Sequence, residues 1–189
     1  MRRLMVSFLF LGLFQLVQAQ IGRNIVVGRD PVVSKTFNLG TFTSITSNTS
    51  VNVYLRQDGK QSVEAKGQQN IMDLLVLEVK DGTLKIDFQP NASFRTKEPV
   101  NLYIALAQLN TLVVSGSGNV KGESLFNASK QLDMVLSGSG NVMLRFEAQE
   151  LRCAISGSGD ANLTGDADKY MVAISGSGDF LLDGHPKNK

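Results

Sequence analysis

Four Asn and Asp side chains are the clearest candidates for chemistry in this chain, because they recur at one position of a repeated motif. The motif reads SGSGN or SGSGD and starts at residues 115, 137, 156 and 175, at intervals of 22, 19 and 19 residues. The candidates are Asn119, Asn141, Asp160 and Asp179. If the copies stack on one another, these polar groups form a ladder that suits a polar, repetitive ligand.

The two aspartates of this ladder are candidate ligands for a cation. Carboxylate oxygens suit a hard cation, but Asp160 directly follows Gly159, and the interval is longer than that of the calcium-binding nonapeptide repeat. An Asx turn, in which the side chain bonds to nearby backbone, explains Asp160 and Asp179 without an ion. We therefore predict no metal site and no cofactor.

Residues for nucleophilic catalysis are scarce. The chain has one Cys, Cys153, and one His, His185, which lies in a polar tail. A nucleophile elbow has the pattern Gly-x-Ser-x-Gly, which the strict Ser/Gly alternation of the motif does not match. Zinc-protease, CxxC and Walker motifs are absent. Asp160 and Asp179 would lie closer together than glycoside hydrolysis prefers. We predict that the protein is not an enzyme and has no catalytic residues.

The charge balance argues against nucleic acid as a partner. The chain has 19 Lys and Arg and 17 Asp and Glu. Two of the cations, Arg2 and Arg3, lie in a segment that we expect to be removed, which leaves 17 charges of each sign. A nucleic-acid-binding protein needs an excess of cations to displace counterions from the phosphates.

Alternating apolar residues flank each motif copy and identify it as a bend between two strands rather than a flexible linker. The residues three positions before the four copies are Leu112, Met134, Cys153 and Val172. The residues one position before them are Val114, Leu136, Ile155 and Ile174. Alternation at one phase predicts that the same face is buried each time, with Cys153 in the core. The predicted bend residues are Ser115, Gly116, Gly118, Ser137, Gly138, Gly140, Ser156, Gly157, Gly159, Ser175, Gly176 and Gly178.

A unit of 19 residues has a suitable length for one coil of a β-solenoid. Coils that stack at about 4.8 Å, the ordinary strand spacing, place equivalent residues above one another. Neighbouring coils then bury a shared apolar interior that no single unit could bury alone.

The residues before the repeat also predict strands, in antiparallel hairpins. Asp58-Gly59 and Asp81-Gly82 each separate two runs of alternating apolar residues, which is a strong hairpin signal. A short helical turn is expected over 70–74. No linker separates this part from the repeat, so we predict one domain.

Residues 1–19 have the charged start, apolar run and cleavage site of a secretory signal peptide. The apolar run is shorter than the roughly 20 residues that span a bilayer, and no other stretch predicts a transmembrane segment. We expect export to the periplasm or the cell surface, with residues 20–31 as an N-terminal lead.

The segments FNLGTFTSITSNTSVNVYLRQ, DGTLKIDF and VNLYIALAQLNTLVVSGSGNV, together with the repeated motif and LLDGHPK, resemble the family called putative auto-transporter adhesin, head GIN domain. The resemblance covers residues 32–187. It implies an exported, right-handed, β-helix-like protein of Bacteroidetes-type bacteria, and it supplies no catalytic residues. The predicted fold is all-β and single-domain, with antiparallel hairpins over 32–106 leading into the parallel β-helix coils of 107–187.

Two functions from different classes fit these observations. The first is a rigid scaffold that contacts a glycan, an envelope polymer or a protein through the polar ladder. The alternative is a carrier of an apolar small molecule or lipid, in a pocket between hairpins and coils. Phe94, Phe126 and Phe146 are candidates for its lining, although packing in the core is the role that we expect of these rings. An apolar pocket above about 300 Å³ would favour the carrier. In a third, structural interpretation, the edge of the last coil pairs with another copy.

Overall fold

The structure is a computed structural model that describes residues 25–184, so the predicted signal peptide lies outside the described residues. The elements of the first half are β1 (Ile25–Val27), β2 (Val32–Phe37), β3 (Ser44–Ser47), β4 (Asn52–Gln57), β5 (Ser62–Gln68), α1 (Gln69–Met72), β6 (Leu75–Lys80), β7 (Thr83–Phe88), β8 (Ser93–Arg95) and β9 (Asn101–Leu106). Those of the second half are β10 (Thr111–Val114), β11 (Val120–Leu136), β12 (Val142–Ile155), β13 (Ala161–Ile174) and β14 (Phe180–Asp183). The predicted all-β class and the short helical turn are both confirmed.

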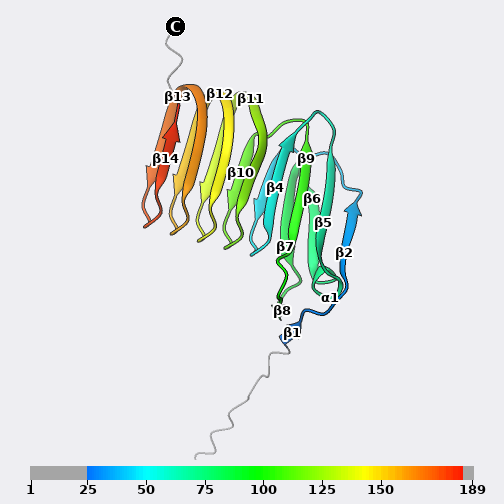
Figure 1. Ribbon diagram of the computed structural model, residues 1–189. Helices are drawn as coiled ribbons and strands as arrows, with labels where there is room; N and C mark the ends of the chain where they lie inside the picture. Colours follow the sequence, from blue (N-terminus) through cyan, green and yellow to red (C-terminus); the bar gives the residue numbers. More distant parts are fainter. Residues whose placement is uncertain (1–24, 185–189) are drawn as a thin grey trace, which may run out of the picture.

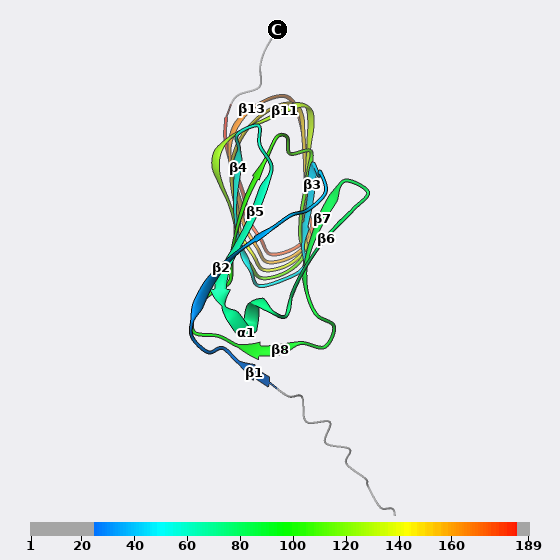
Figure 2. The same ribbon diagram turned by 90° about the vertical axis from the view of Figure 1, so that its right-hand side faces the viewer.

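The motif copies connect strands that stack in parallel. Along β10 to β13, Leu112 pairs with Met134, Met134 with Cys153, and Cys153 with Val172. The motif bends form a row along one edge of the stack (Figure 1). Figure 2 looks along the stack and shows the coils superposed as a flattened ring, with β4 and β5 on one long side and β3, β6 and β7 on the other. The predicted strand–bend–strand unit is therefore confirmed.

The longer first interval of the repeat is absorbed within β11. Its pairing with β12 shifts between Lys121 and Leu125 and again between Ala128 and Gln131. These irregularities accommodate the three residues by which the first interval, 22, exceeds the later interval of 19. The motif bends therefore stay aligned although the coils differ in length.

The first half departs from the predicted series of antiparallel hairpins. The Asp81-Gly82 hairpin of β6 and β7 is confirmed, but β4 and β5 are not neighbours, because β9 lies between them. The chain reverses direction at the Asp58-Gly59 turn, but β4 and β5 are separated by the width of one strand. β9 occupies this position and pairs parallel with β4 and antiparallel with β5. Likewise, β3 and β4 join the parallel stack beside β10 and β11.

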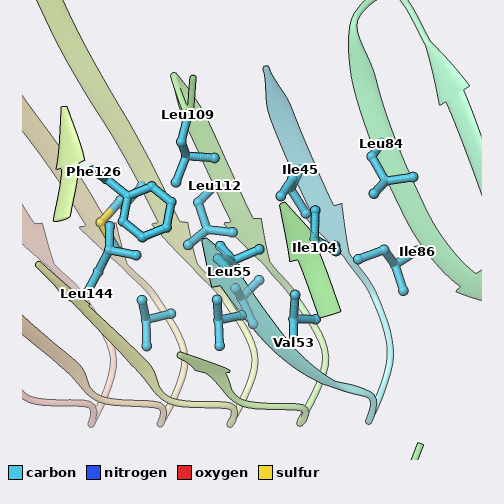
Figure 3. Packing of buried hydrophobic residues seen from close by; sticks show 14 of the residues in the cluster. Ile45, Val53, Leu55, Leu84, Ile86, Ile104, Leu109, Leu112, Phe126 and Leu144 are labelled. Carbon is cyan, nitrogen blue, oxygen red and sulfur yellow. The ribbon is translucent and has the colours of Figure 1, made fainter. Parts of the chain in front are cut away.

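The apolar side chains of the coils fill one continuous interior. Ile45 of β3, Leu112 of β10 and Phe126 of β11 point into it (Figure 3). Gly122 is the exception to the apolar pattern after the motif, because a Cβ there would lie 2.8 Å from the Leu144 side chain and 2.9 Å from the Phe126 ring. The Phe126 ring thus takes the space that an apolar side chain occupies in later coils.

The interior is open at the last coil. Val172 and Ile174 were predicted to be buried, yet they are 41% and 49% exposed. The reason is that β14 pairs only with Ala161–Thr164 of β13, and among residues 25–184 no strand covers the rest of that edge. The predicted pairing of this edge with another copy stays a prediction. No helix of this described region is long and apolar enough to cross a bilayer.

Candidate functional site

The four predicted ladder residues lie in one row, and hydrogen bonds link them from coil to coil. The backbone N–H of Asn141 donates to Oδ1 of Asn119 at 3.0 Å, and that of Asp160 donates to Oδ1 of Asn141 at 2.9 Å. The Asp179 N–H donates to Oδ1 of Asp160 at 2.9 Å. The side chains therefore bind the backbone of the next coil, and Asn and Asp alternate freely because both carry an acceptor at Oδ1.

The ladder continues into two residues that the sequence analysis missed. The Asn119 N–H donates to Oδ1 of Asn52 at 3.3 Å, and Nδ2 of Asn52 donates to Oδ1 of Asn101 at 3.3 Å. Asn52 ends a fifth bend, residues 48–52, which lacks the motif yet stacks under the first copy. The available signal was the position of Asn52 directly before the alternating residues Val53 and Leu55.

The motif glycines are required by close approach between coils. A Cβ at Gly138 would lie 1.9 Å from the carbonyl oxygen of Gly116, and one at Gly157 would lie 1.9 Å from that of Gly138. The predicted bend residues are thus all brought to one edge of the stack. Ser137 and Ser115 are in contact there, with 3.0 Å between their hydroxyl oxygens.

Beside the ladder, the outer surface is hollowed, with a volume of about 290 Å³. We call this the ladder hollow, and it is lined by Asn119, Lys121, Asn141, Met143, Asp160 and Asn162. Its amide, carboxylate and ammonium groups both donate and accept hydrogen bonds. Across residues 25–184 no three His, Cys, Asp or Glu side chains converge as a potential metal site, so the Asp160–Asp179 pair gains no third ligand of those types.

A second, apolar hollow of about 600 Å³ lies on the outer face of β11, β12 and β13. Its apolar lining includes Val135, Ala154, Met171 and Ala173. This hollow does not lie between the hairpins and the coils, so the pocket predicted there stays a prediction. The core packing expected of the three Phe residues is confirmed: Phe126 and Phe146 are fully buried, and Phe94 packs against Phe88 at the core, with 4.5 Å between the ring centres.

Arg152, which lines the apolar hollow, belongs to a cluster of charged side chains. Glu150 pairs with Arg152 at 2.8 Å and with Lys169 at 3.4 Å. The hydrogen bond from Arg152 is the main cause that holds the pKa of the Glu150 carboxyl below its ordinary value. All three side chains reach solvent, so we expect this cluster to contribute little to stability.

Cys153 occupies the predicted core position, and burial raises the pKa of its thiol to about 11. Only the thiolate is an efficient nucleophile. We therefore expect native protein at pH 8 to resist alkylation by iodoacetamide, with reactivity rising only as the pH approaches 11. Denatured protein, whose thiol has an ordinary pKa, should react fully at pH 8 and serves as the control. Rapid labelling of the native protein at pH 8 would contradict this assignment.

The sequence matches the family described as putative auto-transporter adhesin, head GIN domain, over residues 41–185. No curated protein matches it.

Three similar solved structures share this fold. A putative adhesin from Parabacteroides distasonis ATCC 8503 has a TM-score of 0.66 and 24% identity, over 86% of this chain and 79% of that one. A putative adhesin from Bacteroides fragilis NCTC 9343 has a TM-score of 0.59 and 18% identity, over 83% and 99%. A putative lipid binding protein from P. distasonis ATCC 8503 has a TM-score of 0.57 and 16% identity, over 83% and 98%.

Proposed function

The chain belongs to the putative auto-transporter adhesin, head GIN domain family, and on that premise we propose that it is a non-enzymatic scaffold that binds a glycan, an envelope polymer or a protein. The family indicates an exported or surface protein, and the proposal places it in the periplasm or at the cell surface. It includes the prediction that the parallel coils form a right-handed β-helix, a rigid form that suits an extended ligand.

The observation that carries this proposal is the ladder of six Asn and Asp residues together with the ladder hollow. Oδ1 of Asn119, Asn141 and Asp160 is fixed by the next coil, which holds each side chain in one orientation. The Asn119 amide nitrogen also donates to Oδ1 of Asn52 at 3.5 Å, whereas the Asn141 amide nitrogen and the second Asp160 oxygen are left for a ligand, at the strand interval of about 4.8 Å. A preorganised polar row loses little entropy when it binds a repetitive polymer.

A glycan and envelope-polymer binding screen on the purified exported protein tests the proposal. The matched variant is Asp160→Asn/Asp179→Asn, which keeps the Oδ1 acceptor but removes both charges. We expect it to retain the melting temperature of the wild-type protein and to bind several-fold more weakly, because a carboxylate forms stronger hydrogen bonds than an amide. Absence of any polymer or protein ligand for the wild-type protein would contradict the proposal.

The second candidate function is a carrier of an apolar small molecule or lipid. The apolar hollow favours it, since its volume of about 600 Å³ lies within the range of small-molecule sites, and one structure with the same fold is named a putative lipid binding protein. Ala154→Glu places a charge in this hollow from an exposed position. Fatty-acid binding that Ala154→Glu abolishes, without glycan binding, would select the carrier over the scaffold.

A further inference from the structure

Two tyrosine rings are stacked on the outer face of the sheet. Tyr54 of β4 and Tyr103 of β9 are register partners on neighbouring parallel strands. Their ring centres are 5.1 Å apart, and the rings are inclined by only 14°. Each ring restricts the other, so the phenol groups are held in fixed positions before any ligand arrives.

The stacked rings form one wall of a hollow of about 220 Å³, which we call the tyrosine hollow. Its other lining side chains include Arg56, Ser62, Glu64, Ala105 and Glu123. Ala105 is small and buried, which leaves room between the tyrosines and the charged groups. Hydrogen-bonding side chains therefore surround a small space whose apolar lining includes the tyrosine rings, Ile104 and Ala105.

Several of these polar groups have no protein partner. Within the described part of the chain, no hydrogen bond or ion pair engages the hydroxyls of Tyr54 and Tyr103 or the Glu123 carboxylate. By contrast, Arg56 is paired with Asp58 at 2.9 Å, and Glu64 accepts a hydrogen bond from Ser34. The free groups can both donate and accept, which matches the hydroxyl groups of a sugar.

Charge and size exclude other ligand classes. Glu64 and Glu123 outnumber Arg56, which is already paired, so an anionic group is disfavoured. The polar lining is unsuited to a lipid chain. The volume of about 220 Å³ is smaller than the roughly 300–1,000 Å³ of drug-sized ligand sites and suits one ring of a longer molecule.

We propose that the tyrosine hollow binds one ring of a neutral saccharide chain. This inference rests on the proposed binding function and supplies a ligand class and a second site for it. The sugar hydroxyls bond to the two phenols and to Glu123, and the apolar C–H groups of the ring contact the edges of the tyrosine rings.

The same face offers a path for the rest of the chain. Tyr54 is the register partner of Lys121, and Lys121 lines the ladder hollow. The two hollows thus lie along one row of outward side chains, which runs from the two tyrosines through Lys121 to Met143 and Asn162. A saccharide that crosses the strands can occupy the tyrosine hollow with one ring and the ladder hollow with another.

The test is calorimetric titration of the exported protein with neutral glucose, mannose and galactose oligosaccharides. Tyrosine fluorescence reports binding independently, because the chain has three Tyr and no Trp. The variant Tyr54→Phe/Tyr103→Phe keeps both rings and removes both hydroxyls, so folding is preserved. Tyr170→Phe, which removes a hydroxyl that accepts a hydrogen bond from the Ala167 N–H, is the control at the third tyrosine. We expect at least one oligosaccharide to bind, with Kd raised about tenfold or more in the double variant and unchanged in the control.

Raising NaCl to about 0.5 M should leave this binding unchanged, because the ligand is neutral. Binding of oligolysine instead of sugars, lost at high salt, would overturn the inference in favour of a cationic partner. If the wild-type protein binds glycan but the double variant binds equally well, this site is wrong and the proposed function stands. If the wild-type protein binds no glycan, polymer or protein at all, both fail.

Discussion

Gly157→Ala should destabilise the protein by more than about 4 kcal/mol or prevent folding altogether, the range reached when packing cannot relax. The added Cβ would lie 1.9 Å from the carbonyl oxygen of Gly138 and 2.7 Å from that of Ser137. Both obstacles are backbone atoms of the previous coil, so no side chain can rotate away. Relief requires the two coils to separate, which breaks the bonds from the Ser158 and Gly159 N–H groups to the Gly138 oxygen.

Two control variants separate this effect from ordinary substitution costs. Ser158→Ala alters the same bend at an exposed position and should change stability by less than about 0.5 kcal/mol. Gly59→Ala adds a Cβ in open space at a φ of +79°, so it should cost about 1 kcal/mol of backbone strain alone. Chemical denaturation monitored by circular dichroism measures all three. A loss for Gly157→Ala no larger than that for Gly59→Ala would show that the coils are not in close contact there.

Phe126→Ala should lower the free energy of unfolding by about 3–5 kcal/mol, the usual cost of removing a buried Phe ring. The ring is fully buried, and it fills the interior beside Gly122 and Leu144. Because Gly122 has no side chain and the neighbouring coils are tied by backbone hydrogen bonds, the surroundings cannot collapse into the cavity. Urea denaturation should therefore show a lower midpoint with a similar slope.

The neighbouring Leu125→Ala is the matched control, because Leu125 is 46% exposed on the outer face. It should change the free energy of unfolding by less than about 0.5 kcal/mol. If Phe126→Ala left stability unchanged and instead abolished binding of an apolar ligand, the assignment of Phe126 to the core would be wrong. The carrier would then become the preferred function.

Much of the coil architecture is readable from short segments. The phase of alternation around each bend identified Leu112, Met134 and Cys153 as inward residues, and all three are buried. The Asp81-Gly82 hairpin was equally visible, since Asp81 has a φ of +50° and Gly82 one of +71°. These features depend on backbone preferences and side-chain direction over a few residues, which the local sequence specifies.

Other features depend on which distant segments become neighbours. The sequence contains no local signal that places β9 between β4 and β5. The stacked pair of Tyr54 and Tyr103 exists only because β9 lies beside β4.

The polar ladder illustrates both sources of information. Its four motif members were predicted from spacing, whereas Asn52 and Asn101 joined it only through strand pairing. The exposure of Val172 and Ile174 was likewise decided by the absence of a covering strand among the described residues, not by their own types.

Alternation and turn chemistry are properties of a few consecutive residues, so the sequence alone determined the strands, the bends and the buried face. Strand order and surface hollows arise from contacts between residues far apart in the chain, and only the tertiary structure decided them.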